Sequence, residues 1–194
     1  SYLMLFEDGN RIDLTLLPMD DLEQYLREDS ILQVLLDKDG IVPALPESTD
    51  QDYWIKRPTP GMFDDCCNEF WWLITYVAKG LARKEMPYAN AHLDFMRNQL
   101  MTMLSWQIGL EQGFTFSIGK QFKYLQQHVS ASVWQRLIDT WDGSSPKACK
   151  NSLEWMLVLF REISKHVSKG LEYSYPDYDK KVSQYLASLG FTTS

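Results

Sequence analysis

Prolines at positions 43, 46, 58 and 60 divide the chain into two parts with different patterns. Proline fixes φ and has no backbone N–H, so neither a helix nor an interior strand continues easily through such a stretch. We therefore expect an irregular segment here and a domain boundary, with one domain over residues 1–50 and a second over residues 51–194. At 194 residues, the chain is long enough to bury a sizeable core.

The first part is patterned for β structure. Residues 2–7 and 11–17 are expected to form two strands across the turn Asp8-Gly9-Asn10. A short helix should follow from Asp20 to about Glu28, and residues 31–36 predict a third, short strand. Because an isolated two-stranded hairpin is only marginally stable in water, these strands need a larger sheet to join. We therefore expect this sequence to be part of a longer protein.

The second part is patterned for helices. Proline, glycine and serine separate segments with helical periodicity. The expected helices lie near residues 62–85, 87–112, 120–128, 131–141, 147–170 and 177–189. Such a set packs as a bundle. The predicted fold class is therefore α+β, with a few strands followed by a mainly α-helical bundle domain.

Composition excludes several classes of function. The net charge of −7 argues against binding to a phosphate backbone, since nucleic-acid-binding proteins need clustered Lys and Arg. No apolar run approaches the ~20 residues of a membrane span, so we expect no contact with a membrane. Three cysteines, two of them adjacent, fit buried thiols in a reducing cytosol. No zinc-ligand spacing is present.

Asp13 is the only acid in the predicted strand over residues 11–17, where apolar residues alternate with polar ones. Side chains alternate between the two faces of a strand, so Arg11, Asp13 and Thr15 share one face. One interpretation is an edge strand with a solvated outer face. The other is a metal-binding acid in a nucleotide site, because Mg²⁺ prefers rigidly held carboxylate oxygens.

The first long helix carries two stripes of side chains. One is the core stripe, at helical spacing. It consists of Phe63, Cys67, Phe70, Ile74, Val77 and Leu81. The other runs from acids through rings to bases on one side of the helix. It consists of Asp65, Glu69, Trp72, Tyr76, Lys79 and Arg83.

The second stripe has two interpretations. Glu69 and Lys79 are separated by roughly 15 Å along the helix, which suits a cleft that receives a cation at one end and phosphates at the other. The helix macrodipole, however, favours acids near any N-terminus and bases near any C-terminus. The rings of Trp72 and Tyr76 argue against a plain solvated face, and predict a covered cleft or a second packing surface.

Two other candidates are better explained by local structure. Gly119-Lys120 resembles part of a phosphate loop, but it lacks the preceding glycine of that motif and is expected to form a plain turn. Asp177 and Asp179 have the form of a metal-binding pair. Because they follow Pro176 at a predicted helix start, we interpret them as capping residues.

Seven segments of the sequence resemble one family. They are Ser1–Asp8, Arg11–Pro18, Leu35–Asp39, Phe63–Trp71, Gly109–Phe114, Phe116–Lys120 and Tyr175–Lys180. These segments are similar to the aminoglycoside 6-adenylyltransferases, and the likeness covers nearly the whole chain. The resemblance implies a cytoplasmic resistance enzyme that moves AMP from ATP to the 6-hydroxyl of streptomycin, using Mg²⁺.

The resemblance also implies roles for particular residues. Asp13 falls at the third of three metal-binding acids, on the last strands of a nucleotidyltransferase sheet. Asp65 and Glu69 would receive the cationic groups of the aminoglycoside, while Lys79 and Lys84 would reach the triphosphate. In the family, the other two acids come from an Asp-x-Asp pair that follows a Gly-Ser turn on an early strand, and that combined element is absent here, because the Gly-Ser and Asp-x-Asp pairs of this sequence lie in other contexts. We therefore expect a chain without the N-terminal part of the enzyme, and inactive by itself.

A protein of another class is the alternative. A non-catalytic helical module would use the acidic end of the stripe to capture a cationic ligand or partner, and its hairpin would complete a partner's sheet. A Gly-Ser turn and an Asp-x-Asp pair upstream in the parent reading frame would favour the enzyme.

Overall fold

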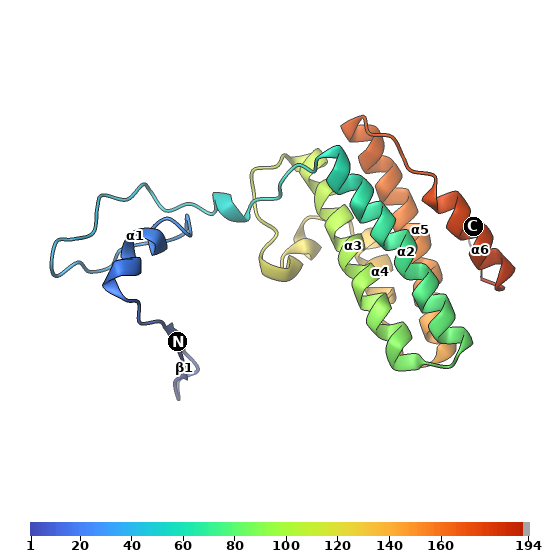
Figure 1. The fold of residues 1–194 in the computed structure, drawn as a ribbon, viewed down its shortest axis with the longest axis horizontal. Coiled ribbons are helices and arrows are strands. Elements are labelled where there is room, and N and C mark those ends of the chain that lie inside the picture. The colour runs from blue at the N-terminus through green and yellow to red at the C-terminus, as the bar shows by residue number, and fades with distance from the viewer. Residues whose placement is uncertain (192–194) are drawn as a thin grey trace. The chain divides into compact units, whose positions relative to one another are not determined.

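The computed structural model describes residues 1–191, which divide into two compact units. The first unit is Ser1–Asp52, and the second begins at Tyr53. Figure 1 shows the elements of both along the chain. The chain is mainly helical with one small two-stranded sheet, which agrees with the predicted α+β class.

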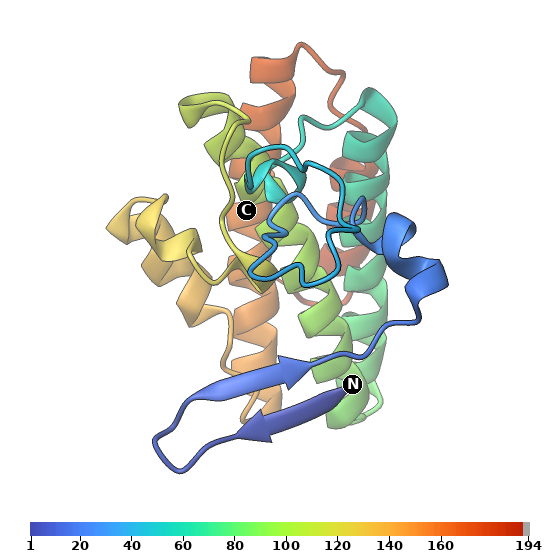
Figure 2. The same cartoon turned by 90° about the vertical axis from the view of Figure 1, so that its left-hand side faces the viewer.

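The sheet of the first unit is an antiparallel hairpin, drawn as two blue arrows in Figure 2. Its strands are β1 (Tyr2–Leu5) and β2 (Arg11–Leu14), each shorter than predicted. Asp8 shapes the turn, because its carboxylate accepts hydrogen bonds from the backbone N–H and the side-chain amide of Asn10. The predicted hairpin is therefore confirmed.

The rest of the first unit is irregular apart from short helices, the last of which, η2 (Gln51–Tyr53), begins at its end. A 3₁₀ helix, η1 (Met19–Asp21), leads into α1 (Leu22–Tyr25). The prediction of a third strand over residues 31–36 is wrong, since these residues pair with no strand. A β-prone segment adopts stable strand structure only where a neighbouring strand satisfies its backbone groups.

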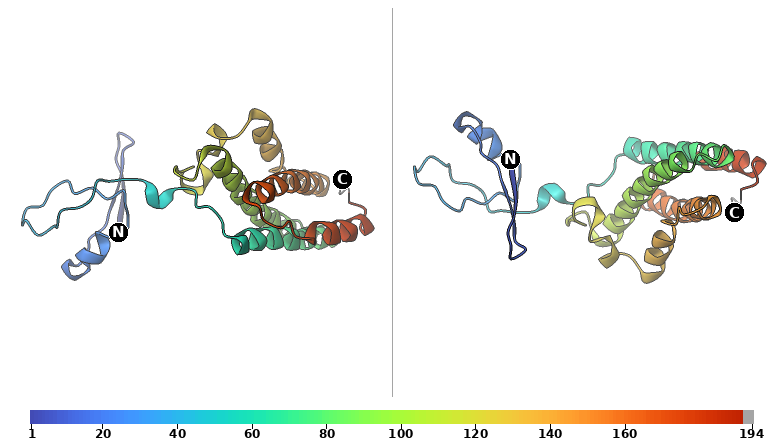
Figure 3. Two further views of the ribbon diagram at one scale, coloured as in Figure 1. Left: turned by 90° about the horizontal axis from the view of Figure 1, so that it is seen from above. Right: turned by 90° about the horizontal axis from the view of Figure 1, so that it is seen from below.

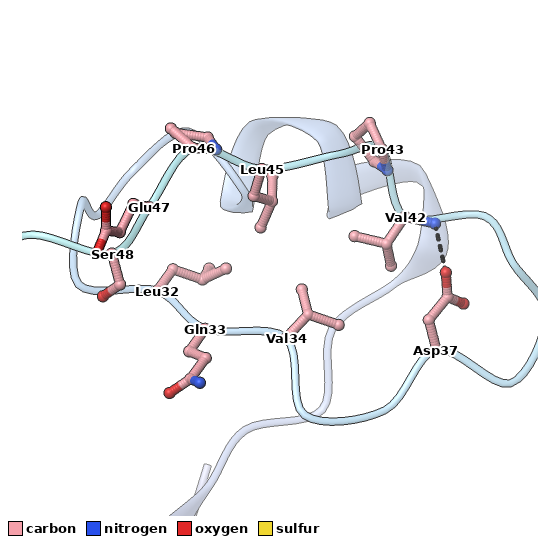
Figure 4. Close-up of a pocket in the computed structure, with 10 residues that line it drawn as sticks. All are labelled: Leu32, Gln33, Val34, Asp37, Val42, Pro43, Leu45, Pro46, Glu47 and Ser48. Carbon is pink, nitrogen blue, oxygen red and sulfur yellow. Dashed lines mark hydrogen bonds between the residues drawn. The ribbon is translucent and has the colours of Figure 1, made fainter.

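Asp37 organises the turn that follows, as Figure 4 shows for its bond with Val42. Its carboxylate accepts hydrogen bonds from the backbone N–H groups of Gly40, Ile41 and Val42. The bond from Val42 is the main cause that lowers the pKa of Asp37. This acid holds a loop together, as an aspartate in a turn commonly does.

No residue of the first unit is buried. Leu35 is 89% exposed and Leu5 is 78% exposed, and both strands are exposed over most of their length. Exposure of so many apolar side chains is typical of a segment that packs against another part of a protein.

The described part of the second unit contains five α-helices. They are α2 (Pro60–Ala82), α3 (Met86–Gln112), α4 (Ala131–Asp139), α5 (Pro146–Leu171) and α6 (Tyr178–Ser188). The side chains of Thr59, Ser130 and Ser145 each accept a hydrogen bond from the first turn of α2, α4 and α5, respectively. Proline at the first turn of α2, α3 and α5 fits this position because its missing N–H would be unpaired there anyway.

The expected helix over residues 120–128 is wrong. Two 3₁₀ turns, η3 (Lys120–Phe122) and η4 (Leu125–Gln127), replace it. Gln121 and Phe122 adopt left-handed backbone conformations with φ of 52° and 62°, which interrupt any continuous helix.

The core of the second unit lies between α2, α3 and α5, which run side by side in Figures 1 and 3. The α4 helix packs on α5, and α6 packs on α2. Phe70 of α2 stacks on Phe160 of α5, with ring centroids 3.7 Å apart, and Trp71 meets Phe160 edge-on. Among the described residues, no helix is both long and apolar enough to cross a bilayer.

Candidate functional site

The exposed side of α2 carries the acids and bases that the sequence pattern placed together. Asp65, Glu69 and Lys79 are all exposed, whereas the core stripe is buried except for Leu81, which is half-buried. No ion pair joins Asp65 or Glu69 to a cation of the described residues. Two carboxylates one helical turn apart on the surface are free to receive a cationic ligand.

Two rings lie between the acids and the bases. The indole N–H of Trp72 donates to the hydroxyl oxygen of Tyr76 at 2.9 Å, and the rings meet edge-on at 6.0 Å. Trp72 is 56% exposed, so the expectation that a cleft covers it is not met in the described structure. The expectation of a second packing surface holds for Tyr76, whose ring lies 5.0 Å from His92 of α3.

The α3 helix extends this aromatic surface with residues that the sequence analysis did not single out. Tyr88 and Phe95 both contact the ring of His92, with centroids at 4.2 and 5.8 Å. In the sequence, positions 88, 92 and 95 are four and three residues apart, which places their side chains on one side of a helix. This spacing is the signal that could have identified them. Exposed rings beside carboxylates can stack on guanidinium or ammonium groups.

The bases at the end of α2 are placed differently from each other. The ammonium group of Lys79 lies 5.8 Å from the ring centroid of Tyr76, on the same side of the helix as Glu69. Lys84 lies outside α2, because the helix ends at Ala82 and Lys84 has a left-handed φ of 61°. The expected helix over residues 62–85 was thus too long at this end. The left-handed residue closes the turn through a hydrogen bond from Glu85 N–H to Gly80 carbonyl.

Asp13 lies on β2 opposite Leu3. Both of its carboxylate oxygens accept hydrogen bonds from the guanidinium of Arg11 at 2.8 Å, which raises the pKa of Arg11. The side chains of Arg11 and Asp13 share one face of the strand, as predicted, and are 63% and 49% exposed, respectively. Within residues 1–191, no group of three or more acids, histidines or cysteines could hold a metal ion.

The cysteines have no role in this surface. Cys66, Cys67 and Cys149 are free and buried. Burial raises the pKa of Cys66, and it raises that of Cys67 to about 12. These two thiols therefore stay protonated near neutral pH, and a protonated thiol is a poor nucleophile.

The pair Asp177 and Asp179 does not cap α6, contrary to our interpretation. Asp177 occupies the N-cap position without a side-chain capping bond, and instead pairs with Lys181 at 2.8 Å. Asp179 is buried and accepts a bidentate pair of hydrogen bonds from Arg161 of α5, at 2.8 and 2.9 Å. Ser183 adds a further hydrogen bond at 3.1 Å. This acid fastens α6 to α5.

Comparison with known proteins places the chain in a family. The family described as "Streptomycin adenylyltransferase" matches residues 1–189. A protein named aminoglycoside 6-adenylyltransferase from Campylobacter jejuni is 48% identical over 187 residues, covering 96% of this chain and 65% of that protein. Proteins of the same name from Bacillus subtilis and Staphylococcus aureus are 45% and 37% identical, over 95% and 96% of this chain and 66% and 67% of their own lengths.

The fold agrees with these matches. The crystal structure of an aminoglycoside 6-adenyltransferase from Bacillus subtilis superimposes with a TM-score of 0.69 at 42% identity, covering 98% of this chain and 70% of that one. The resemblance noted in the sequence is confirmed, and the chain belongs to the streptomycin adenylyltransferase family. It spans about two thirds of the length of the curated relatives it matches.

Proposed function

We propose that this chain provides the substrate-binding part of an aminoglycoside 6-adenylyltransferase, which moves AMP from ATP to the 6-hydroxyl of streptomycin in the cytoplasm. The main support is that three relatives, 37–48% identical over nearly the whole chain, share that name. These matches favour the enzyme over a non-catalytic binding module.

The surface of α2 suits the two substrates of such a reaction. In this proposal, Asp65 and Glu69 bind the cationic groups of the aminoglycoside through charge-assisted hydrogen bonds. Lys79 and Lys84 reach the triphosphate, where a compact positive charge stabilises phosphoryl oxygens. Glu69 and Lys79 lie on one exposed side of the helix, so one rigid element would set the distance between the two substrates.

The first unit would be the end of a nucleotidyltransferase sheet. Its lack of buried residues supports packing against further strands. Asp13 would contribute one carboxylate to a Mg²⁺ site, where the metal offsets developing charge on the phosphate. A single acid does not make such a site, and the described residues contain no cluster that does. The other ligands must come from elsewhere.

Substitutions of Glu69 and Lys79 are expected to weaken the binding of different substrates. Titration of this chain by calorimetry should show that Glu69→Gln weakens streptomycin binding by about 1.5–3 kcal/mol, as expected for hydrogen bonds to a charged group, and spares ATP. Lys79→Met should weaken ATP binding and spare streptomycin.

Two variants on α5 serve as controls for this experiment. Glu162→Gln and Lys169→Met change exposed residues of the same charge and should alter neither affinity. If only the helix dipole accounts for the stripe, then Glu69→Gln and Lys79→Met would change stability by ~0.3–1 kcal/mol and leave both affinities unchanged. That result would remove the bisubstrate role from α2.

By itself, the chain is expected to release no pyrophosphate from ATP in the presence of Mg²⁺ and streptomycin. Nucleotidyl transfer needs a fully ligated metal, and Asp13 is a single ligand. The comparison sample is the same chain joined to the segment of the Bacillus subtilis relative that the match leaves out. Turnover by the chain alone at the rate of the joined protein would show that no essential group lies outside it.

A further inference from the structure

The segment Tyr175–Lys180 resembles the family but lies outside the surface proposed to bind the substrates. It leads into α6, which packs on α2 (Figure 1). Two tyrosines of this region, Tyr173 and Tyr178, donate hydrogen bonds to the start of α2 and to the residue just before its N-cap. The N-terminal half of α2 is also the part that carries Asp65 and Glu69.

Tyr173 ties the start of α2 to the end of α5. It follows Glu172, the left-handed residue at which α5 ends. Its hydroxyl group donates a hydrogen bond to the carbonyl of Pro58 at 2.8 Å, one residue before the N-cap Thr59. Its ring lies 5.9 Å from that of Phe63, which is buried in the first turn of α2. A single side chain thus holds both the entry into α2 and its first turn.

Tyr178 makes a second contact with the same end of α2. Its hydroxyl group donates to the carboxylate of Asp64 at 3.2 Å. Asp64 precedes Asp65 in the chain, and the two side chains point about 100° apart around the helix axis. The bond therefore holds α2 beside the acid proposed to bind the aminoglycoside and leaves that acid unoccupied.

The buried pair of Arg161 and Asp179 fixes the position of Tyr178. Asp179 follows Tyr178 directly, and its carboxylate accepts the bidentate hydrogen bonds of Arg161. The same guanidinium lies 5.6 Å from the ring centroid of Trp71. Trp71 and Asp64 are seven residues apart, so both lie on one side of α2. This side is therefore held at two levels, two helical turns apart.

The other end of α2 is held by different residues. The ring of Tyr76 lies 5.0 Å from that of His92 on α3. The turn after the helix is closed by the hydrogen bond from Glu85 N–H to Gly80 carbonyl. Loosening the contacts of Tyr173 and Tyr178 should therefore affect the acidic end of α2 and spare the end that carries Lys79.

We propose that Tyr173 and Tyr178 are positioning residues for the aminoglycoside. The end turns of a helix open most readily, and these two hydroxyl groups hold the N-terminal end of α2 closed. Asp65 and Glu69 are then ordered before a cationic ligand arrives, so less conformational entropy is lost on binding. The inference rests on the proposed function, in which these two acids receive the aminoglycoside, and it adds residues from outside α2.

Replacing each tyrosine by phenylalanine removes only the hydroxyl group. In calorimetric titrations of the chain, Tyr173→Phe and Tyr178→Phe should each bind streptomycin about 3–10-fold more weakly, because the loss cannot exceed the net contribution of one hydrogen bond. Their affinity for ATP should not change. Amide hydrogen exchange should become faster over Phe63–Glu69 and stay the same over Val77–Ala82. The control Tyr185→Phe, at an exposed position of α6, should behave as the parent does.

A double variant tests whether Tyr178 acts through Asp64. Adding Tyr178→Phe to Asp64→Ala should weaken streptomycin binding no further, since the hydrogen bond is already lost. A further loss would show that the hydroxyl group contacts the ligand itself, and would overturn the positioning role of Tyr178. Equal losses of streptomycin and ATP affinity in the single variants would indicate general loss of structure and overturn it as well.

The proposed function is judged by the parent chain and by Glu69→Gln. If Glu69→Gln weakens streptomycin binding while Tyr173→Phe and Tyr178→Phe do not, the proposed function stands and the positioning role is refuted. If the parent binds no streptomycin, the proposed function fails in its choice of substrate, and the positioning role fails with it.

Discussion

Replacing Asp179 by alanine is expected to lower the free energy of unfolding by about 3 kcal/mol. The substitution removes the partner of Arg161, whose guanidinium lies 5.6 Å from the ring of the buried Trp71. A largely buried cation left without its partner costs about 3–5 kcal/mol of stability. Because both side chains of this pair keep some exposure to solvent, we expect a loss at the lower end of that range. Urea unfolding measures the change, and hydrogen exchange should show α6 opening first.

Asp177→Ala is the matched control, two residues earlier. Its ion pair with Lys181 is about two-thirds exposed on both sides, so its loss should cost less than about 1 kcal/mol. The double variant Arg161→Met/Asp179→Leu removes both charges of the buried pair and should recover much of the loss. Equal effects of Asp177→Ala and Asp179→Ala would show that Asp179 does not fasten α6 to α5.

The second large effect is expected from a substitution of Asp13. It is measured in the chain joined to the segment of the Bacillus subtilis relative that the match leaves out. Asp13→Asn should lower kcat by about two orders of magnitude or more, because metal stabilisation of the transition state is worth several kcal/mol. Folding should be nearly unaffected, since asparagine preserves the shape and half of the side chain is exposed. Adenylyl transfer to streptomycin and thermal unfolding measure the two quantities.

Arg11→Gln separates the two interpretations of Asp13. If Asp13 only forms a surface ion pair, removing either partner has the same small effect. If Asp13 binds metal, Asp13→Asn loses activity and Arg11→Gln does not. Asp39→Asn, an exposed acid of the same unit, should be as active as the parent. A fully active Asp13→Asn variant would show that Asp13 does not bind the metal and is only a solvated side chain of an edge strand.

Helical periodicity predicted the parts of the second unit that depend on local pattern. Phe63, Phe70 and Ile74 recur on one side of α2, and all three are buried where α2 meets its neighbours. The same spacing put Glu69 and Lys79 on the opposite, exposed side. Both predictions succeeded because side-chain direction along a helix follows from its 3.6-residue turn alone.

Other features were missed because they depend on partners distant in sequence. Residues 31–36 have strand propensity but no strand to pair with. Asp179 follows a proline at a helix start, like a capping residue, but its carboxylate accepts hydrogen bonds from Arg161 of α5 instead. Only the packed structure brings these two residues together, through the contact of α6 with the rest of the unit.

By itself, the sequence determined the family, the α+β class, the helices with strong periodicity and the exposed charged side of α2. These features follow from motifs and from local backbone geometry, which each segment carries independently of its neighbours. The tertiary structure alone decided the aromatic contact of Tyr76 with His92, the Arg161–Asp179 pair and the left-handed loop at Gln121 and Phe122. Each of these depends on contacts between elements, because only packing or a hydrogen bond from another segment offsets the cost of a buried charge or a strained backbone.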